Sequence, residues 1–390
     1  MNLKMMTLNS DKTLFLKLFA IGGVVSIAVG NIFLGLATAT FLWSIYKKGF
    51  RIDCAYSGYY KAIGVFVASM LLSALCSGEI GRGLKVWADF WIWRMMPFVI
   101  VMTTIREERT AKNVLYAGYL GFGLATAMVL WQGMHGMSRA NGFFGHPMTY
   151  AGFSCIFLPL LLVGVLDNKL ERRLRIVYAL LLACGCLALG FNGTRGAWLG
   201  VAVAFMVVVC SFAGIDKRSL ISGFVIMAMV GGIFYINPSF HKRAGTITNI
   251  KRHTERLLIW ESSLKMFKDH PVTGVGLGQW EDNYHKKYIS PKAKEPKLGH
   301  SHNNYLQMLA ENGIVGFAGF MVMFGYILLN NMFSWIKNKN PYALNIVVST
   351  VAIMVQGLTE YNAGNSIVMK MYWLVLACSL VLREWWNSKE

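Results

Sequence analysis

Two histidines separated by one residue, His300 and His302, stand out in the segment GHSHNNYLQMLAENGIVGF (residues 299–317), directly ahead of a continuously hydrophobic stretch. A helix that begins here would place His302 at its positive N-terminal end, which favours the neutral imidazole that a general base requires. Two alternatives remain. His302 could be a polar cap that ties the loop to a helix, or the two histidines could bind zinc, although no nearby cysteine or further histidine at ligand spacing supports a metal site.

The same segment predicts a short helix that starts near residues 301–304 and ends at Gly313. On such a helix His302, Leu306, Leu309 and Gly313 would share one face. We therefore expect His302 to turn with the leucines toward the protein interior and away from bulk water.

Three arginines in polar segments are further candidates for a site. Arg195 lies among small residues, where an arginine fork can approach phosphate closely, although a lone arginine at a helix end can also reach for a membrane interface. Arg256 begins a helical pattern, where the helix dipole disfavours a cation, and a salt bridge within the loop is the alternative. Arg139 lies in the polar segment SRANGFFGHP (138–147).

These residues must be positioned by membrane-spanning helices. In the whole chain, 55% of the residues are hydrophobic and only 15% are charged, against about 25% charged in an ordinary soluble domain. The apolar residues form blocks close to the ~20 residues that cross a bilayer as a helix. We predict an all-α polytopic protein with roughly twelve spans, at 14–29, 31–46, 58–77, 84–103, 114–133, 147–166, 176–190, 197–213, 219–236, 314–333, 344–361 and 364–382.

The predicted spans divide the chain into nine helices in residues 1–236, an extramembrane loop at 237–313, and three helices with a short tail in 314–390. Net charge is +19, but the basic residues lie mostly in short loops between hydrophobic blocks, a pattern typical of membrane insertion and not of nucleic-acid binding. Their distribution predicts that both termini face the cytoplasm, and the excess charge could contact anionic lipid headgroups. The seven cysteines predict neither a disulfide framework nor a metal site.

With this orientation, five polar segments meet on the outer side: 138–147, 190–200, Arg256, the histidine motif, and TEYNAGNS (359–366), which supplies the carboxylate of Glu360. A group of this kind predicts a binding site better than any of its members does. Asp89 and Arg94, inside the fourth span, are predicted to make a structural polar contact.

The long loop contains RLLIWESSLKMFKDHPVTGVGLGQW (256–280), in which Leu257, Trp260, Leu264 and Phe267 recur at helical spacing. They predict an amphipathic helix along the membrane surface. Pro271 ends this helix, and three glycines at 274, 276 and 278 predict a flexible turn. As a nucleotide-binding fingerprint the turn is weak, since no strand precedes it.

The loop segment, followed by GHSHNNYLQMLAENGIVGFAGF, resembles the motif region of bacterial O-antigen ligases and of the related O-antigen polymerases. The smaller segments SRANGFFGHP, NGTRGAWLG and GLTEYNAGNS also resemble motifs of this family, so the resemblance covers about residues 138–366. It implies a metal-independent, inverting glycosyl transfer without a cofactor, in the inner membrane and on its periplasmic face. The donor would be a glycan on undecaprenyl diphosphate, and for a ligase the acceptor would be lipid A–core.

The resemblance also assigns roles to residues. The family's catalytic histidine corresponds to His302, followed by Asn303, and its diphosphate-binding arginines correspond to Arg195 and Arg256. Arg139 and Arg243 are weaker matches. His300, Asn303 and Glu360 complete the predicted substrate-binding set. The tight HSHNNYLQ motif and the single long loop favour the ligase over the polymerase, and a lipid-linked sugar transporter is the remaining alternative.

Overall fold

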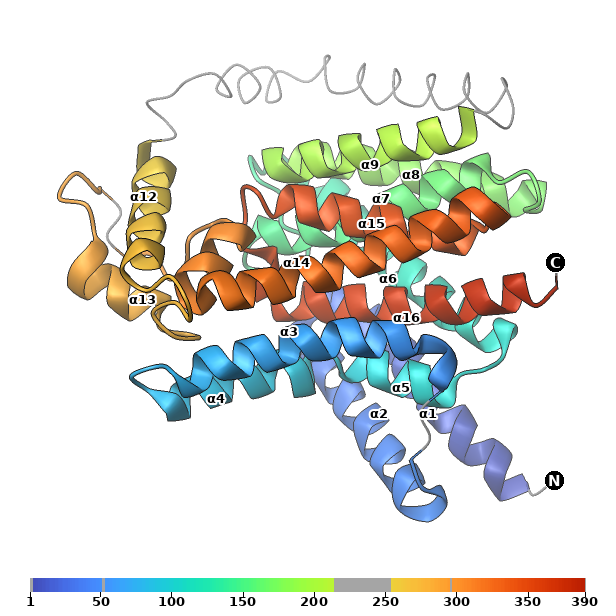
Figure 1. The fold of residues 1–390 in the computed structure, drawn as a ribbon. Helices are drawn as coiled ribbons and strands as arrows, with labels where there is room; N and C mark the ends of the chain where they lie inside the picture. Colours follow the sequence, from blue (N-terminus) through green and yellow to red (C-terminus); the bar gives the residue numbers. More distant parts are fainter. Residues whose placement is uncertain (1–2, 51–52, 214–253, 295–296, 390) are drawn as a thin grey trace.

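The structure is a computed structural model that describes residues 3–50, 53–213, 254–294 and 297–389. In these ranges the chain forms helices and no strand, which confirms the all-α prediction (Figure 1). The α-helices are α1 (Leu3–Val25), α2 (Ile27–Lys48), α3 (Ser57–Leu75), α4 (Ile80–Ala88), α5 (Met96–Thr104), α6 (Glu108–Met134), α7 (Pro147–Leu166), α8 (Arg172–Asn192), α9 (Arg195–Ala213), α12 (Thr254–Asp269), α13 (Trp280–Asn283), α14 (Asn304–Asn338), α15 (Pro341–Gln356) and α16 (Ser366–Asn387).

Within the described residues, nine helical segments are long and apolar enough to cross a membrane, and two shorter apolar helices accompany them. These helices coincide with the spans predicted from the sequence. The predicted span 219–236 and the first part of the predicted loop lie outside the described residues. The chain is therefore a multi-pass membrane protein by the length and composition of its helices.

The fourth span is interrupted. Helix α4 continues through a π-helical turn, Asp89–Trp93, into α5. Arg94 donates from Nε and Nη2 to the Asp89 carboxylate at 2.8 and 2.6 Å, and from Nη1 to the carbonyls of Ala363 and Gly364 at 2.9 and 3.0 Å. The predicted structural contact is confirmed. It also fixes the turn that follows Glu360.

Helices α7 and α16 form the centre of the bundle. Nearly all of their side chains are buried, as expected for helices that are apolar on every face. Helix α16 nevertheless buries two charged residues, Lys370 and Arg383. Lys370 lies 2% exposed in α16 and donates to Asn31 Oδ1 at 2.8 Å, so its charge ties α16 to α2.

The two ends of the bundle differ. At the end where α16 finishes, basic side chains lie against the C-terminal segment, with Lys112, near the start of α6, over the ring of Trp385 and Lys169, in the loop after α7, over that of Trp386. In Figure 1 both termini lie at this end, whereas α12 and α13 lie at the opposite end. Basic loops on one side and the loop helices on the other agree with the alternating spans that the sequence predicts.

Helix α12 runs across the direction of the long bundle helices (Figure 1). The side that packs against the protein carries Ile259 and Met266, which are 2% and 0% exposed, whereas Leu257 and Leu264 are 50% and 40% exposed. The predicted apolar face is therefore not the face that packs on the protein. That it lies on a membrane surface stays a prediction.

The glycine turn is tightly packed, contrary to the flexible turn that we expected. Gly274, Gly276 and Gly278 all have positive φ, and a Cβ at Gly274 would lie 2.3 Å from the backbone of Glu311. Val275 and Gly276 donate to the carbonyls of residues 310 and 311 at 2.8 and 3.1 Å. The turn thus holds the end of the short helix that starts at Asn304, where Gly313 breaks the helix with φ +60°.

Candidate functional site

The histidine motif enters α14 through an asparagine cap. The Asn303 side chain accepts hydrogen bonds from the amides of Tyr305 and Leu306 at 2.9 and 3.0 Å, so the helix begins at Asn304. His302 precedes the cap and has φ +50°, in the left-handed region. The prediction that His302 lies on a helical face with Leu306 and Leu309 is wrong, because asparagine is a strongly preferred N-cap and the residue before it leaves the helix.

The two asparagines tie this motif to the segment before α16. Asn303 Nδ2 donates to the Leu358 carbonyl at 2.9 Å, and the Asn304 amide donates to the Gly357 carbonyl at 2.7 Å. Asn304 also accepts from the Ala363 amide at 3.1 Å. These bonds bring Glu360 beside His302. Because the polar atoms of Asn303 are bonded to backbone, they favour a structural role for it over substrate contact.

His302 and Glu360 form a pair. His302 Nδ1 lies 3.4 Å from Glu360 Oε1, and the Glu360 residue is 7% exposed. Burial acts to raise the pKa of the Glu360 carboxyl, but the hydrogen bond and charge of His302, together with His300 and Arg256, bring the pKa below its ordinary value. Glu360 is thus a carboxylate near neutral pH. An Nδ1–H donated to it leaves His302 Nε2 as the proton acceptor.

His300 packs against this pair, with its ring centroid 4.2 Å from that of His302 and 5.6 Å from that of Tyr361. Its Nδ1 accepts the backbone N–H of His302 at 3.2 Å. Burial, reinforced by His302, lowers the pKa of His300 to about 4, although Glu360 opposes the shift. His300 is therefore neutral at physiological pH.

The pair opens on a polar cavity of about 380 Å³. Its wall contains His146, Met148, Thr149, Gly299, His300, His302, Glu360, Tyr361, Asn362, Gly364 and Asn365. His146 was missed as an individual candidate. Its Nδ1 accepts from the Met148 amide at 3.3 Å and so caps α7, and the sequence signal is a histidine directly before the helix-starting Pro147.

None of the predicted arginines that the structure describes lines the cavity. Arg256 acts electrostatically on Glu360, and Arg139 acts on His146, whose pKa is lowered chiefly by burial. Arg195 is the first residue of α9, and the next residue, Gly196, packs so closely on Thr359 that a Cβ would lie 2.1 Å from its hydroxyl. Arg243 lies outside the described residues.

Potential metal-ligand atoms of His300, His302 and Glu360 lie within 4.8 Å of one another. The hydrogen bonds of the two histidines disfavour metal binding by these atoms. His300 Nδ1 accepts an amide proton, which places the ring proton on Nε2, and His302 Nδ1 faces a carboxylate. In this arrangement only the Nε2 atom of His302 offers a ring lone pair to the cavity. Proton transfer fits these atoms better than metal ligation.

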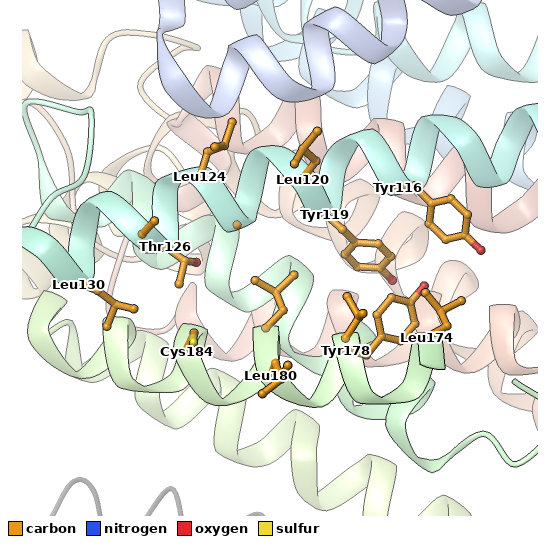
Figure 2. Close-up of a pocket in the computed structure, with 14 residues that line it drawn as sticks. Tyr116, Tyr119, Leu120, Leu124, Thr126, Leu130, Leu174, Tyr178, Leu180 and Cys184 are labelled. Carbon is orange, nitrogen blue, oxygen red and sulfur yellow. The ribbon is translucent and has the colours of Figure 1, made fainter. Parts of the chain in front are cut away.

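A larger groove of about 580 Å³ lies between α6 and α8 (Figure 2). Its wall is almost wholly apolar, with Leu120, Leu124 and Leu180 among its exposed side chains. Figure 2 shows the rings of Tyr119 and Tyr178 side by side near one end. None of the predicted site residues lines this groove. Its apolar wall can contact a hydrocarbon chain but offers no group suited to catalysis.

Residues 177–321 match the family model described as O-antigen ligase. The matched residues, which make up less than half of the chain, are similar to the O-antigen ligase family. This confirms the resemblance found in the sequence. The matched segment includes Arg195, Arg256, His300 and His302, whereas Arg139, His146 and Glu360 lie outside it.

The chain is also similar to an uncharacterized protein of Haemophilus influenzae. The two are 26% identical over 217 residues, which cover 49% of this chain and 52% of the relative. The chain thus matches about half the length of this curated relative. The similarity supports membership of a shared group and assigns no substrate.

Proposed function

We propose that the protein is a glycosyltransferase that moves a glycan from undecaprenyl diphosphate to a sugar hydroxyl of lipid A–core, as an O-antigen ligase. The observation that carries the proposal is the His302–Glu360 pair on the wall of a polar cavity. Its histidine lies inside the segment that matches the family. Similarity to this family supports lipid-linked substrates in general, and the particular donor and acceptor are our inference.

The reaction follows from the pair. His302 Nε2 takes the proton of the acceptor hydroxyl, and the resulting imidazolium is stabilised by the Glu360 carboxylate at Nδ1. The acceptor oxygen forms the new bond to the anomeric carbon of the glycan from the face opposite the leaving group. The bond between that carbon and the diphosphate oxygen breaks, and its electron pair leaves with the lipid diphosphate. Configuration at the anomeric carbon is inverted.

The leaving group already carries charge, so it needs cations more than a general acid. We assign this role to Arg195 and Arg256, with Arg139 as a third. Arg256 acts electrostatically on Glu360, which supports its placement near the reacting centre. None of these arginines lines the cavity, as expected if the diphosphate stays outside it while the sugars enter.

We place the cavity on the periplasmic face of the inner membrane. The basic loops lie at the end of the bundle opposite the cavity, and basic loops are retained on the cytoplasmic side. Both proposed substrates are anchored in lipid, so a site at the helix ends can receive them from within the bilayer plane.

An O-antigen polymerase would use the same donor and leaving group with a different acceptor. The banding pattern of lipopolysaccharide from a strain without this chain separates the two. Loss of all O-antigen from the core, with lipid-linked polymer accumulating, supports the ligase. A single-repeat band indicates the polymerase, and an unchanged pattern would overturn both.

A further inference from the structure

His300 and His302 lie side by side with opposite hydrogen-bonding roles. A neutral imidazole carries one proton, and the nitrogen that accepts a hydrogen bond cannot hold it. His300 Nδ1 accepts the His302 amide, so its proton is on Nε2. His302 Nδ1 faces the Glu360 carboxylate, so its proton is on Nδ1. One ring is therefore a donor at Nε2, and its neighbour is an acceptor at Nε2.

No residue in the described part of the chain accepts a hydrogen bond from His300 Nε2. The ring nevertheless forms part of the cavity wall, where a ligand can provide the acceptor. An unused donor beside a proton acceptor suits a molecule that offers a hydroxyl to one and a second oxygen to the other.

The charges of the wall indicate what kind of molecule this is. Among the described residues, the wall holds the Glu360 carboxylate, neutral amides such as Asn365, the hydroxyl of Thr149, and neither lysine nor arginine. A buried carboxylate with one oxygen, Oε2, lacking a partner among these residues would repel a phosphate. An uncharged, polyhydroxylated molecule fits this wall.

We propose that His300 is a specificity-determining residue that donates from Nε2–H to a second oxygen of the acceptor sugar, while His302 takes the proton of the attacking hydroxyl. This rests on the proposed function, since it names the acceptor side of the same reaction. The two rings together select a sugar that presents an oxygen next to its reactive hydroxyl.

His300 could instead only support the left-handed backbone of His302 through Nδ1. Two substitutions separate these roles. In His300→Asn the side-chain oxygen can still accept the His302 amide, but no N–H reaches the position of Nε2. In His300→Gln the amide N–H reaches that position, but the acceptor near Nδ1 is lost.

The test measures transfer by the full-length protein in detergent or nanodiscs, with lipid A–core from the deletion strain as the acceptor. We expect His300→Asn to raise KM for lipid A–core about threefold to tenfold, because one hydrogen bond to the acceptor is lost, and to leave kcat within about twofold of wild type. His300→Gln should restore KM toward wild type and lower kcat. The matched control is His285→Asn on the exposed surface, which should change neither constant.

If His300→Asn behaves as wild type while His300→Gln resembles His300→Ala, His300 only supports the backbone and the proposal is overturned.

A second measurement does not depend on activity. Nitrogen NMR of the labelled full-length protein should show the ring of His300, one of eight histidines and assigned by its loss in His300→Gln, as neutral with the proton on Nε2. A proton on Nδ1 or a charged ring at neutral pH would also overturn the proposal. If the wild type transfers nothing to lipid A–core yet this tautomer is present and the ring's signals shift on addition of lipid A–core, the proposed function fails and the binding role of His300 stands.

Discussion

Each end of the bundle buries a charged residue, but the two ends differ in how completely the protein satisfies the polar atoms of that residue itself. Near the C-terminus, Arg383 is 6% exposed and donates from Nη1 to Tyr59, Asn330 and Asn331 at 2.6, 2.8 and 2.9 Å. Its Nε and Nη2 donate to Glu384 at 3.2 and 2.6 Å. At the opposite end, Glu360 is equally buried and has an oxygen without a partner among the described residues.

This difference separates a structural charge from a functional one. At Arg383 the protein itself supplies hydrogen bonds to all three guanidinium nitrogens, as a buried charge requires for stability. At Glu360 the protein supplies one histidine and a cavity of about 380 Å³. The cavity beside the pair leaves room for a substrate, so substitutions at the two ends should affect different properties.

The largest expected effect is on catalysis at the cavity end. Replacing His302 by Asn removes the base but keeps a residue that tolerates the left-handed backbone. We expect transfer to fall about 10²- to 10⁴-fold, since a general base contributes this much. Transfer is measured with lipid-linked donor and lipid A–core, and the unfolding temperature in detergent should stay close to wild type.

His302→Ala is the companion variant, because it removes the same base without the amide of asparagine. Near wild-type transfer in both variants, with the protein inserted in the membrane, would contradict the assignment of His302 as base.

The next effect should appear at the Arg383 end, and in stability. Arg383→Met removes a buried donor from Tyr59 and Asn331, while Asn330 keeps the hydrogen bond from the Tyr59 hydroxyl. The loss should cost about 2–4 kcal/mol in the free energy of unfolding. Thermal unfolding in detergent measures the loss. Transfer by the folded fraction should remain near wild type.

Lys389→Met is the control for charge at this end, since Lys389 is exposed and lies over the ring of Trp385. It should leave the unfolding temperature nearly unchanged. A loss of transfer in Arg383→Met without a loss of stability would break the distinction between the two ends.

A smaller effect on catalysis is expected at the residue that orients the base. Glu360→Gln keeps the shape of the side chain but removes the charge that stabilises the His302 imidazolium. We expect kcat to fall about tenfold to a hundredfold, less than for loss of the base itself. Glu360→Asp should recover part of the rate. If both variants behave as wild type, Glu360 plays no part in the proton transfer.

The elements of this protein could be predicted from the sequence better than its contacts. Apolar blocks fix where helices cross a bilayer, so α7 at 147–166 was predicted to the residue. The pairing of His302 with Glu360, 58 positions apart, depends on how the start of α14 packs against the end of α15, which spacing along the chain does not encode. That His302 and Glu360 lie at the same end of the bundle was predictable from the sequence, but the distance between the two side chains was not.

The error at His302 has a local cause. Helical periodicity was extended one residue too far, into the stretch before the Asn303 cap, and it therefore assigned the wrong face. The asparagine pair at 303 and 304 was the available signal, since asparagine at a helix start favours capping over helix interior.

The smallest expected effect is a pH dependence of stability that belongs to the cavity end. His300 has a pKa of about 4 in the folded protein and about 6.5 when unfolded, so between these values the unfolded chain binds more protons. The free energy of unfolding therefore falls as pH drops from 6.5 toward 4, and His300 has no such effect above 6.5. Glu360, whose folded pKa is lowered, adds a loss only below its unfolded value of 4.5.

Unfolding temperatures at several pH values between 6.5 and 4.5 measure this slope. His300→Asn should flatten it, because asparagine does not titrate, whereas the exposed His285→Asn should leave it unchanged. His146, whose pKa is also lowered, would retain part of the slope in either variant. If His300→Asn and wild type lose stability in parallel, His300 is not held neutral by burial. The cavity end would then lack the electrostatic difference that sets it apart from the Arg383 end.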